Sequence, residues 1–205
     1  MKESTSKFKN LNNKQKLQYI WDYYKVHIIA TAVIICVIIS IASTVIKNTS
    51  VDIYTAYVNV HMPDELLKTI DDRADFSITN YIDLLLTDDP DGQTIEYAYA
   101  SSLKIMSSIS AGDLDIIIAD KVGIDNAYSS GYLCNAGDYL QKENPALYDK
   151  LEPYFLYNEN NECYAIDLSY SSLFNQAGFT DSLYIGIVAS EDISPEVTDY
   201  LSLLF

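Results

Sequence analysis

Residues 93–120 read QTIEYAYASSLKIMSSISAGDLDIIIAD, and this stretch decides the fold class. Apolar and small residues recur in its first part at helical spacing, which predicts a helix over 93–111. These residues are Ala98, Ser102, Ile105, Met106 and Ile109. Gly112 follows directly, where a glycine commonly ends a helix. The isoleucine run within 113–120 predicts a strand covered on both faces, as in a parallel sheet, and helix, glycine and strand in this order indicate a βαβ unit.

The remainder of residues 51–205 continues this alternation of strand and helix patterns. Strand patterns cover residues 51–60, 77–86, 156–166 (as a hairpin) and 183–189. Helical patterns cover a segment opened by Pro63, two short pieces within 124–141, residues 170–176, and a last helix that starts at Ser194-Pro195. Residues 143–152, around Pro145, are expected to be a connecting segment. The alternation predicts an α/β domain.

Residues 26–46, VHIIATAVIICVIISIASTVI, contain no charged side chain. About 20 helical residues cross the ~30 Å hydrocarbon core of a bilayer, so we predict a transmembrane helix here. Residues 1–25 form a basic arm with an interfacial helix, and the positive-inside rule places this arm in the cytoplasm. A linker, 47–50, then leads to an extracellular C-terminal domain, 51–205. The alternatives are a cleaved signal peptide, which has a shorter apolar region, and a buried helix of a soluble protein.

Charge is divided unevenly along the chain. Of its 13 Lys and Arg and 29 Asp and Glu residues, 6 cations and 27 acids lie in residues 48–205, a net charge of −21. A domain this acidic repels nucleic acid, so we exclude nucleic acid as a partner. The expected partners are the lipid bilayer of the cell membrane and either a small-molecule ligand or another membrane protein.

A resemblance runs through residues 104–178. The segment KIMSSISAGDLDIIIAD, 104–120, resembles the helix, Ala-Gly-Asp and strand of the extracellular solute-binding proteins of bacterial ABC transporters, which have a type II periplasmic-binding-protein-like fold. Residues 130–140 and 164–178 are similar to later segments of that family, in the same order. The segment YIWDYYKVHI, 19–28, looks like the membrane entry of small uncharacterised membrane proteins from Gram-positive anaerobes.

The resemblance implies a three-layer α/β domain similar to one lobe of the periplasmic-binding-protein fold. Solute-binding proteins of this kind close two lobes around a ligand, whereas residues 51–205 are long enough for one lobe. A single lobe cannot close on a ligand in this way, so the resemblance implies a binding module and leaves transport open.

Catalytic constellations are missing from the sequence of residues 51–205. His61 is its one histidine, and no Gly-x-Ser-x-Gly elbow, phosphate loop or dinucleotide fingerprint occurs. We therefore predict that the protein is not an enzyme and needs neither cofactor nor metal. Cys134 and Cys163 are either a disulfide pair or two unpaired cysteines, and a nucleophile–base pair with His61 is the less favoured alternative.

Candidate ligand-binding residues follow from the rule that ligands of α/β domains bind outside the carboxyl ends of parallel strands. They are Asn59, His61, Asp120, Ser169 and Tyr170. The structural alternatives are that Asp120 caps the next helix and that Asn59 and His61 form an ordinary turn.

Two hypotheses of function follow. The first is a membrane-anchored extracytoplasmic binding module that resembles a solute-binding lobe. The second is a structural or assembly subunit whose external domain docks another membrane protein without a small-molecule ligand. An exposed apolar patch, rather than a polar cleft at the strand ends, would favour docking.

Overall fold

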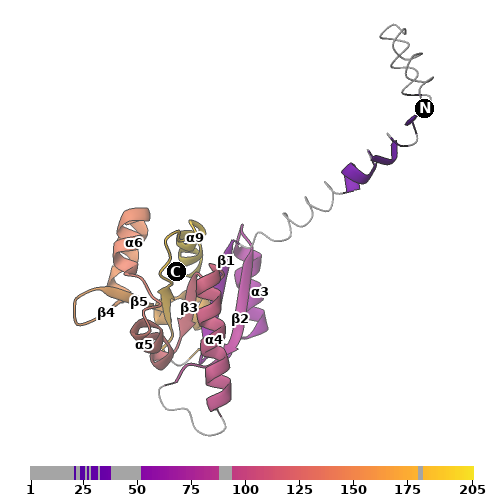
Figure 1. Ribbon diagram of the computed structural model, residues 1–205. Helices are drawn as coiled ribbons and strands as arrows, with labels where there is room; N and C mark the ends of the chain where they lie inside the picture. The colour runs from indigo at the N-terminus through magenta and orange to yellow at the C-terminus, as the bar shows by residue number, and fades with distance from the viewer. Residues whose placement is uncertain are drawn as a thin grey trace, which may run out of the picture. The chain divides into compact units, whose positions relative to one another are not determined.

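A computed structural model describes residues 21, 24–25, 27, 29–31, 33–37, 52–87, 94–179 and 182–205 (Figure 1). The chain divides into two units, Met1–Ser50 and Val51–Phe205. In the first unit, the described residues are helical and exposed. Within the part of the chain that the structure describes, no helix has both the length and the apolar character needed to cross a membrane. The predicted span 26–46 lies largely outside the described residues, as do most of the basic arm and the whole linker, and these stay predictions.

The second unit is built on one sheet of six strands in the order β2-β1-β3-β6-β5-β4. The strands are β1 (Ile53–Val58), β2 (Ile78–Leu84), β3 (Ile116–Ala119), β4 (Phe155–Tyr157), β5 (Cys163–Asp167) and β6 (Tyr184–Ile187). β1 pairs in parallel with β2 and with β3. The remaining pairs, β3–β6, β6–β5 and β5–β4, are antiparallel. The α/β class is confirmed, but the expectation of a parallel sheet holds only for the three strands β2-β1-β3.

Helices cover both faces of the sheet (Figure 1). They are α3 (Asp64–Arg73), α4 (Ile95–Ala111), α5 (Lys121–Ser129), α6 (Ala136–Glu143), α7 (Pro145–Leu151), α8 (Ser172–Gln176) and α9 (Glu196–Leu204), with short 3₁₀ turns η1 (Glu152–Tyr154) and η2 (Leu168–Tyr170). One face, which we call the closed face, packs a single apolar cluster under α3, α6, α7, α8 and α9. The other face, the open face, packs a second cluster under α4 and α5.

Two helix ends explain where the sequence-based expectations held and failed. Gly112 has φ +74°, and the amides of Gly112 and Asp113 donate to the carbonyls of Ile109 and Ser108, so glycine ends α4 as predicted. The expected connecting segment around Pro145 is wrong, because it contains the helix α7. Asn144 caps this helix by accepting from the amide of Leu147 at 3.1 Å, and a proline in the first helical position needs no hydrogen-bond partner for its nitrogen.

The path of the chain places a switch point at β1. From β1 the chain passes through α3 to β2 on one side, and from β2 through α4 to β3 on the other side of β1. The carboxyl ends of β1 and β3 are therefore neighbours, with Val58 paired to Ala119. This is the edge at which α/β domains usually bind ligands.

Candidate functional site

Two of the predicted ligand residues meet at the switch point. The Asn59 side-chain amide donates to Asp120 Oδ1 at 3.0 Å and to the carbonyl of Leu86 at 2.7 Å. Asn59 Oδ1 in turn accepts from the amide of Leu86 at 2.8 Å. The side chain of Asn59 thus holds the segment after β2 against the ends of β1 and β3.

The side chain of Asp120 also forms hydrogen bonds within the fold. Its Oδ1 accepts from the amide of Gly123 at 2.7 Å, which caps the start of α5. A Cβ at Gly123 would lie 3.2 Å from the Asn59 side-chain nitrogen and 2.9 Å from the Ala119 Cβ, so α5 packs closely against this pair at Gly123. The structure brings Asn59 and Asp120 together, but in the structural role of capping and bracing.

The other predicted ligand residues lie apart from this pair. The side chain of His61 is 88% exposed, and its Nδ1 lies 3.6 Å from the carboxylate of Asp83. Ser169 and Tyr170 belong to η2 beyond β5, where Asp167 accepts from the amide and hydroxyl of Ser169. The exposed ring of Tyr170 stacks on Tyr154, with centroids 4.3 Å apart. The five predicted residues therefore form no single cleft.

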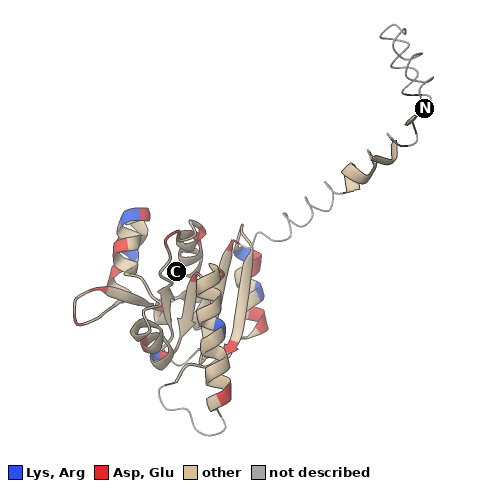
Figure 2. Cartoon of the chain, in the orientation of Figure 1, with Lys and Arg blue, Asp and Glu red and all other residues tan. Residues whose placement is uncertain are grey.

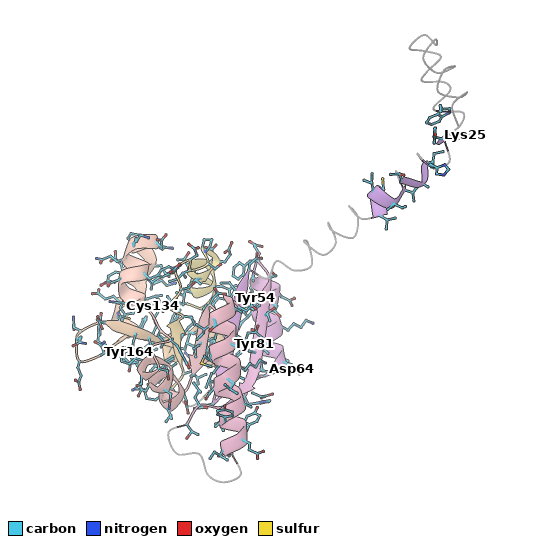
Figure 3. All side chains as sticks on the ribbon, in the orientation of Figure 1. Lys25, Tyr54, Asp64, Tyr81, Cys134 and Tyr164 are labelled. Carbon is cyan, nitrogen blue, oxygen red and sulfur yellow. The ribbon has the colours of Figure 1, made fainter. Side chains whose placement is uncertain are left out.

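Cys134 and Cys163 are both free thiols, so in this structure they are unpaired, the second of the two alternatives from the sequence. Burial raises the pKa of Cys134 to about 11 and that of Cys163 to about 12. At neutral pH both remain protonated, and a protonated thiol is a poor nucleophile. Cys134 is labelled in Figure 3.

An apolar surface runs along α4. Ile95, Tyr99, Leu103 and Met106 are spaced by 4, 4 and 3 residues, so they share one flank of the helix, and we call them the α4 flank. Their exposed fractions are 52, 67, 42 and 49%. Of the residues that predicted this helix by their spacing, Met106 lies on the exposed flank. The side toward the sheet consists of the smaller residues Ala98 and Ser101 with Ile105.

The opposite flank of α4 faces β2. There the hydroxyl of Tyr97 donates to the carbonyl of Asp83, and the Lys104 ammonium lies 4.7 Å above the ring of Tyr81. Glu96 and Lys104 are the charged residues of α4, so the helix is nearly free of charge on an otherwise acidic domain (Figure 2). A helix that is apolar on both its inner and outer sides is normally buried. The α4 flank therefore has the properties of a contact surface.

A surface hollow of about 410 Å³ lies between α5 and the turn of the β4–β5 hairpin. Lys121, Asp125 and Tyr128 line it from α5, and Tyr157, Asn158 and Tyr164 line it from the hairpin. Figure 3 marks Tyr164 at this place. A second hollow of about 280 Å³ lies between α3 and α8.

Comparisons with family models, with curated proteins and with solved structures gave no match to this chain. Neither the α4 flank nor the hollow beside α5 was predicted from the sequence. The spacing of Ile95, Tyr99 and Leu103 was a readable signal for the first. The hollow lies between residues 121–128 and 157–164, and no pattern in the sequence predicts that these two segments are neighbours.

Proposed function

We propose that this protein is a membrane-anchored extracytoplasmic interaction module that docks another membrane protein through the α4 flank. This is the second of the two functions inferred from the sequence. The exposed apolar flank on a nearly uncharged helix is the observation that carries it. A small ligand at the strand ends is less well supported, because Asn59 and Asp120 are bonded within the fold. In this proposal, the domain resembles one lobe of a solute-binding protein but binds its partner through an exposed surface, and not in a cleft between two lobes.

Charge favours a partner other than a second copy. Residues 48–205 carry a net charge of −21, so two such domains repel each other. A partner helix with an apolar stripe and flanking Lys or Arg residues complements both the flank and the surrounding charge. Because exposed charges are screened within about 8 Å at physiological salt, this attraction acts mainly on association and weakens with added salt.

The size of the flank predicts weak docking. Its four side chains are about half exposed, and completing the burial of each gives about 1 kcal/mol, or about 4 kcal/mol together. Association in solution costs at least about 4 kcal/mol in lost translational and rotational freedom. The flank therefore needs a partner held nearby, and two proteins anchored in one membrane meet at a raised effective concentration.

Site-specific photocrosslinking of the full chain in its own cells tests the proposal. A benzophenone side chain at Met106 is compared with one at Tyr157, because the two positions have similar exposure, 49 and 46%, on different surfaces. We expect one discrete adduct with a membrane protein from position 106 and none from position 157. Leu103→Glu should remove that adduct, since it places a charge in the apolar contact.

Two results would contradict docking through α4. One is an adduct of equal intensity from both positions, which indicates random collision. The other is an adduct from position 106 that survives Leu103→Glu. An adduct of the chain with itself would identify a homodimer and would refute the argument from charge.

A further inference from the structure

Thr55 is a polar residue within the apolar cluster of the closed face. It lies between Ile53 and Tyr57 of β1, and both of these side chains belong to that cluster. Since every second residue of a strand points to the same face, the Thr55 side chain points there as well. Thr55 is 0% exposed, and among the described residues its Oγ1 has no hydrogen-bond partner. Burying a hydroxyl without a partner is costly, so this group needs one.

Asn80 has a second unpaired atom beside the first. β1 and β2 pair in parallel with Thr55 opposite Asn80, and Asn80 follows Ile78, which also packs against the closed-face cluster, by two positions. The two side chains are therefore neighbours on one face of the sheet. Asn80 Oδ1 is buried and, like Thr55 Oγ1, has no partner in the part of the chain that the structure describes.

The other end of the Asn80 side chain is already bonded. Burial raises the pKa of Asp71 on α3, and a hydrogen bond from the Asn80 side-chain amide opposes this rise. The amide nitrogen of Asn80 thus faces the carboxylate of Asp71, and a planar amide then directs its oxygen elsewhere. This bond fixes the side chain and leaves Oδ1 as a buried acceptor.

Two tyrosines bring further hydroxyls to the same place. The hydroxyls of Tyr57 and Tyr200 lie 3.2 Å apart, and both residues are 0% exposed. Burial raises the pKa of Tyr200, and the neighbouring hydroxyls of Tyr57 and Thr55 oppose this rise. We call the hydroxyls of Thr55, Tyr57 and Tyr200, together with Asn80 Oδ1, the buried polar group. It lies between the sheet and the helices α3 and α9.

The hydrogen bonds of the buried polar group do not balance within the described residues. Each of its three hydroxyls has one O–H donor, and the contact between Tyr57 and Tyr200 uses one of these donors. The donor of Thr55 and one tyrosine donor remain, and Asn80 Oδ1 remains as an acceptor. A ligand of this group must therefore accept two hydrogen bonds and donate at least one.

We propose that the buried polar group binds one internal water molecule, which accepts from Thr55 and from a tyrosine hydroxyl and donates to Asn80 Oδ1. Water fits because it has two acceptor and two donor sites, and buried waters typically make about three hydrogen bonds to groups that a protein leaves unpaired. A metal cation does not fit, because it offers no acceptor to the hydroxyl protons. The site lies on the closed face, whereas α4 covers the open face, so it does not depend on docking.

Oxygen-17 magnetic relaxation dispersion of the full chain tests the proposal. This method counts water molecules that stay in a protein much longer than surface waters do, and it does not detect exchanging hydroxyl protons. Thr55→Val keeps the shape of the side chain and removes its hydroxyl, so we expect it to bind one long-lived water fewer than wild type. Thr79→Val is the matched control, because Thr79 is a half-buried residue of β2 that points to the open face, and it should leave the count unchanged.

The urea midpoint gives an independent readout of opposite sign. If water bridges the group, Thr55→Val leaves Asn80 Oδ1 and a tyrosine hydroxyl with a weakened partner, so the midpoint should fall. If the Thr55 hydroxyl is simply unpaired, valine removes a buried polar atom and the midpoint should rise. Such a rise overturns the proposal.

Asn80→Leu is a second variant in case Thr55→Val does not fold. It removes the acceptor at similar volume, so it should also bind one long-lived water fewer than wild type. The proposal is overturned if the folded variants of Thr55 and Asn80 bind as many long-lived waters as wild type. It is also overturned if Thr79→Val loses a water in the same way, because the count then does not report on the buried polar group.

Discussion

Asn59→Ala distinguishes a structural Asn59 from a ligand-binding one. The change removes three hydrogen bonds at once, two to the backbone of Leu86 and one to Asp120. Leu86 is 6% exposed, so its amide and carbonyl lose their partners in a nearly dry place. Asn59 also has φ +59°, a left-handed conformation that asparagine tolerates better than alanine. We expect a marked loss of stability.

The size of that loss follows from its parts. Each buried backbone group left without a partner costs about 1–3 kcal/mol, and alanine in the left-handed region adds about 1 kcal/mol. With the lower value for each of the two backbone groups, the free energy of unfolding falls by about 3 kcal/mol. For a domain of this length, such a change lowers the unfolding midpoint by about 6–12 °C.

Thermal and urea unfolding, followed by near-ultraviolet circular dichroism of the tyrosines, measures this loss. Asn59→Gly is the matched variant, because it removes the same bonds without the backbone strain and should be about 1 kcal/mol more stable than Asn59→Ala. His61→Ala, at an exposed side chain, should change the free energy of unfolding by less than about 0.5 kcal/mol. If Asn59→Ala has the same unfolding midpoint as His61→Ala, the Asn59 side chain does not stabilise the fold. A ligand-binding role for the strand ends would then be the better interpretation.

Three further predictions test other parts of the second unit. Gly123→Ala should destabilise the domain, because a Cβ there lies 2.9 Å from the Ala119 Cβ, and calorimetry should show a lower midpoint than wild type. Cys134 and Cys163, with pKa values raised by burial to about 11 and 12, should resist iodoacetamide at pH 8 until urea unfolds the chain; peptide mapping that finds them joined contradicts this. Burial also raises the pKa of Asp115 above its ordinary 3.8, so native Asp115 binds a proton more readily than unfolded Asp115, and stability falls as pH rises from 3.8 through the raised value. Asp115→Asn keeps an acceptor for the amide of Tyr54, so it should be more stable than wild type at pH 7 but not at pH 3, as urea midpoints will show.

The order of elements was predictable because local patterns determine it. Alternating or continuous apolar runs predicted the strands, and Gly112 marked the end of α4. The direction of β6 was not predictable, because LYIGIVA fits a parallel or an antiparallel strand equally well and long-range pairing decides between them. The missed helix α7 has a different cause. Asn144-Pro145 is a common turn signal, and the same two residues are also a good helix start.

For the candidate sites too, features set by local sequence were predictable and those set by long-range contacts were not. The rule on strand ends selected Asn59 and Asp120 separately, and the order of the strands brings the two side chains together. The rule does not predict that the Asn59 side chain forms hydrogen bonds with the backbone of Leu86, because these bonds depend on the path of the chain after β2. Likewise, the periodicity of α4 shows two apolar sides, and only the packed structure decides which side meets the sheet.

The unequal cover of the two sheet faces explains where the α4 flank lies. Among the described residues, five helices cover one face, and their apolar sides pack in a single cluster. On the other face, α4 and α5 pack on a second cluster that reaches from Leu84 at the end of β2 to Tyr164 and Ala165 of β5. In the part of the chain that the structure describes, two helices cover this face, and the α4 flank stays exposed. Which side of α4 is left exposed therefore follows from how the two faces are covered, and the periodicity of the helix alone does not decide it.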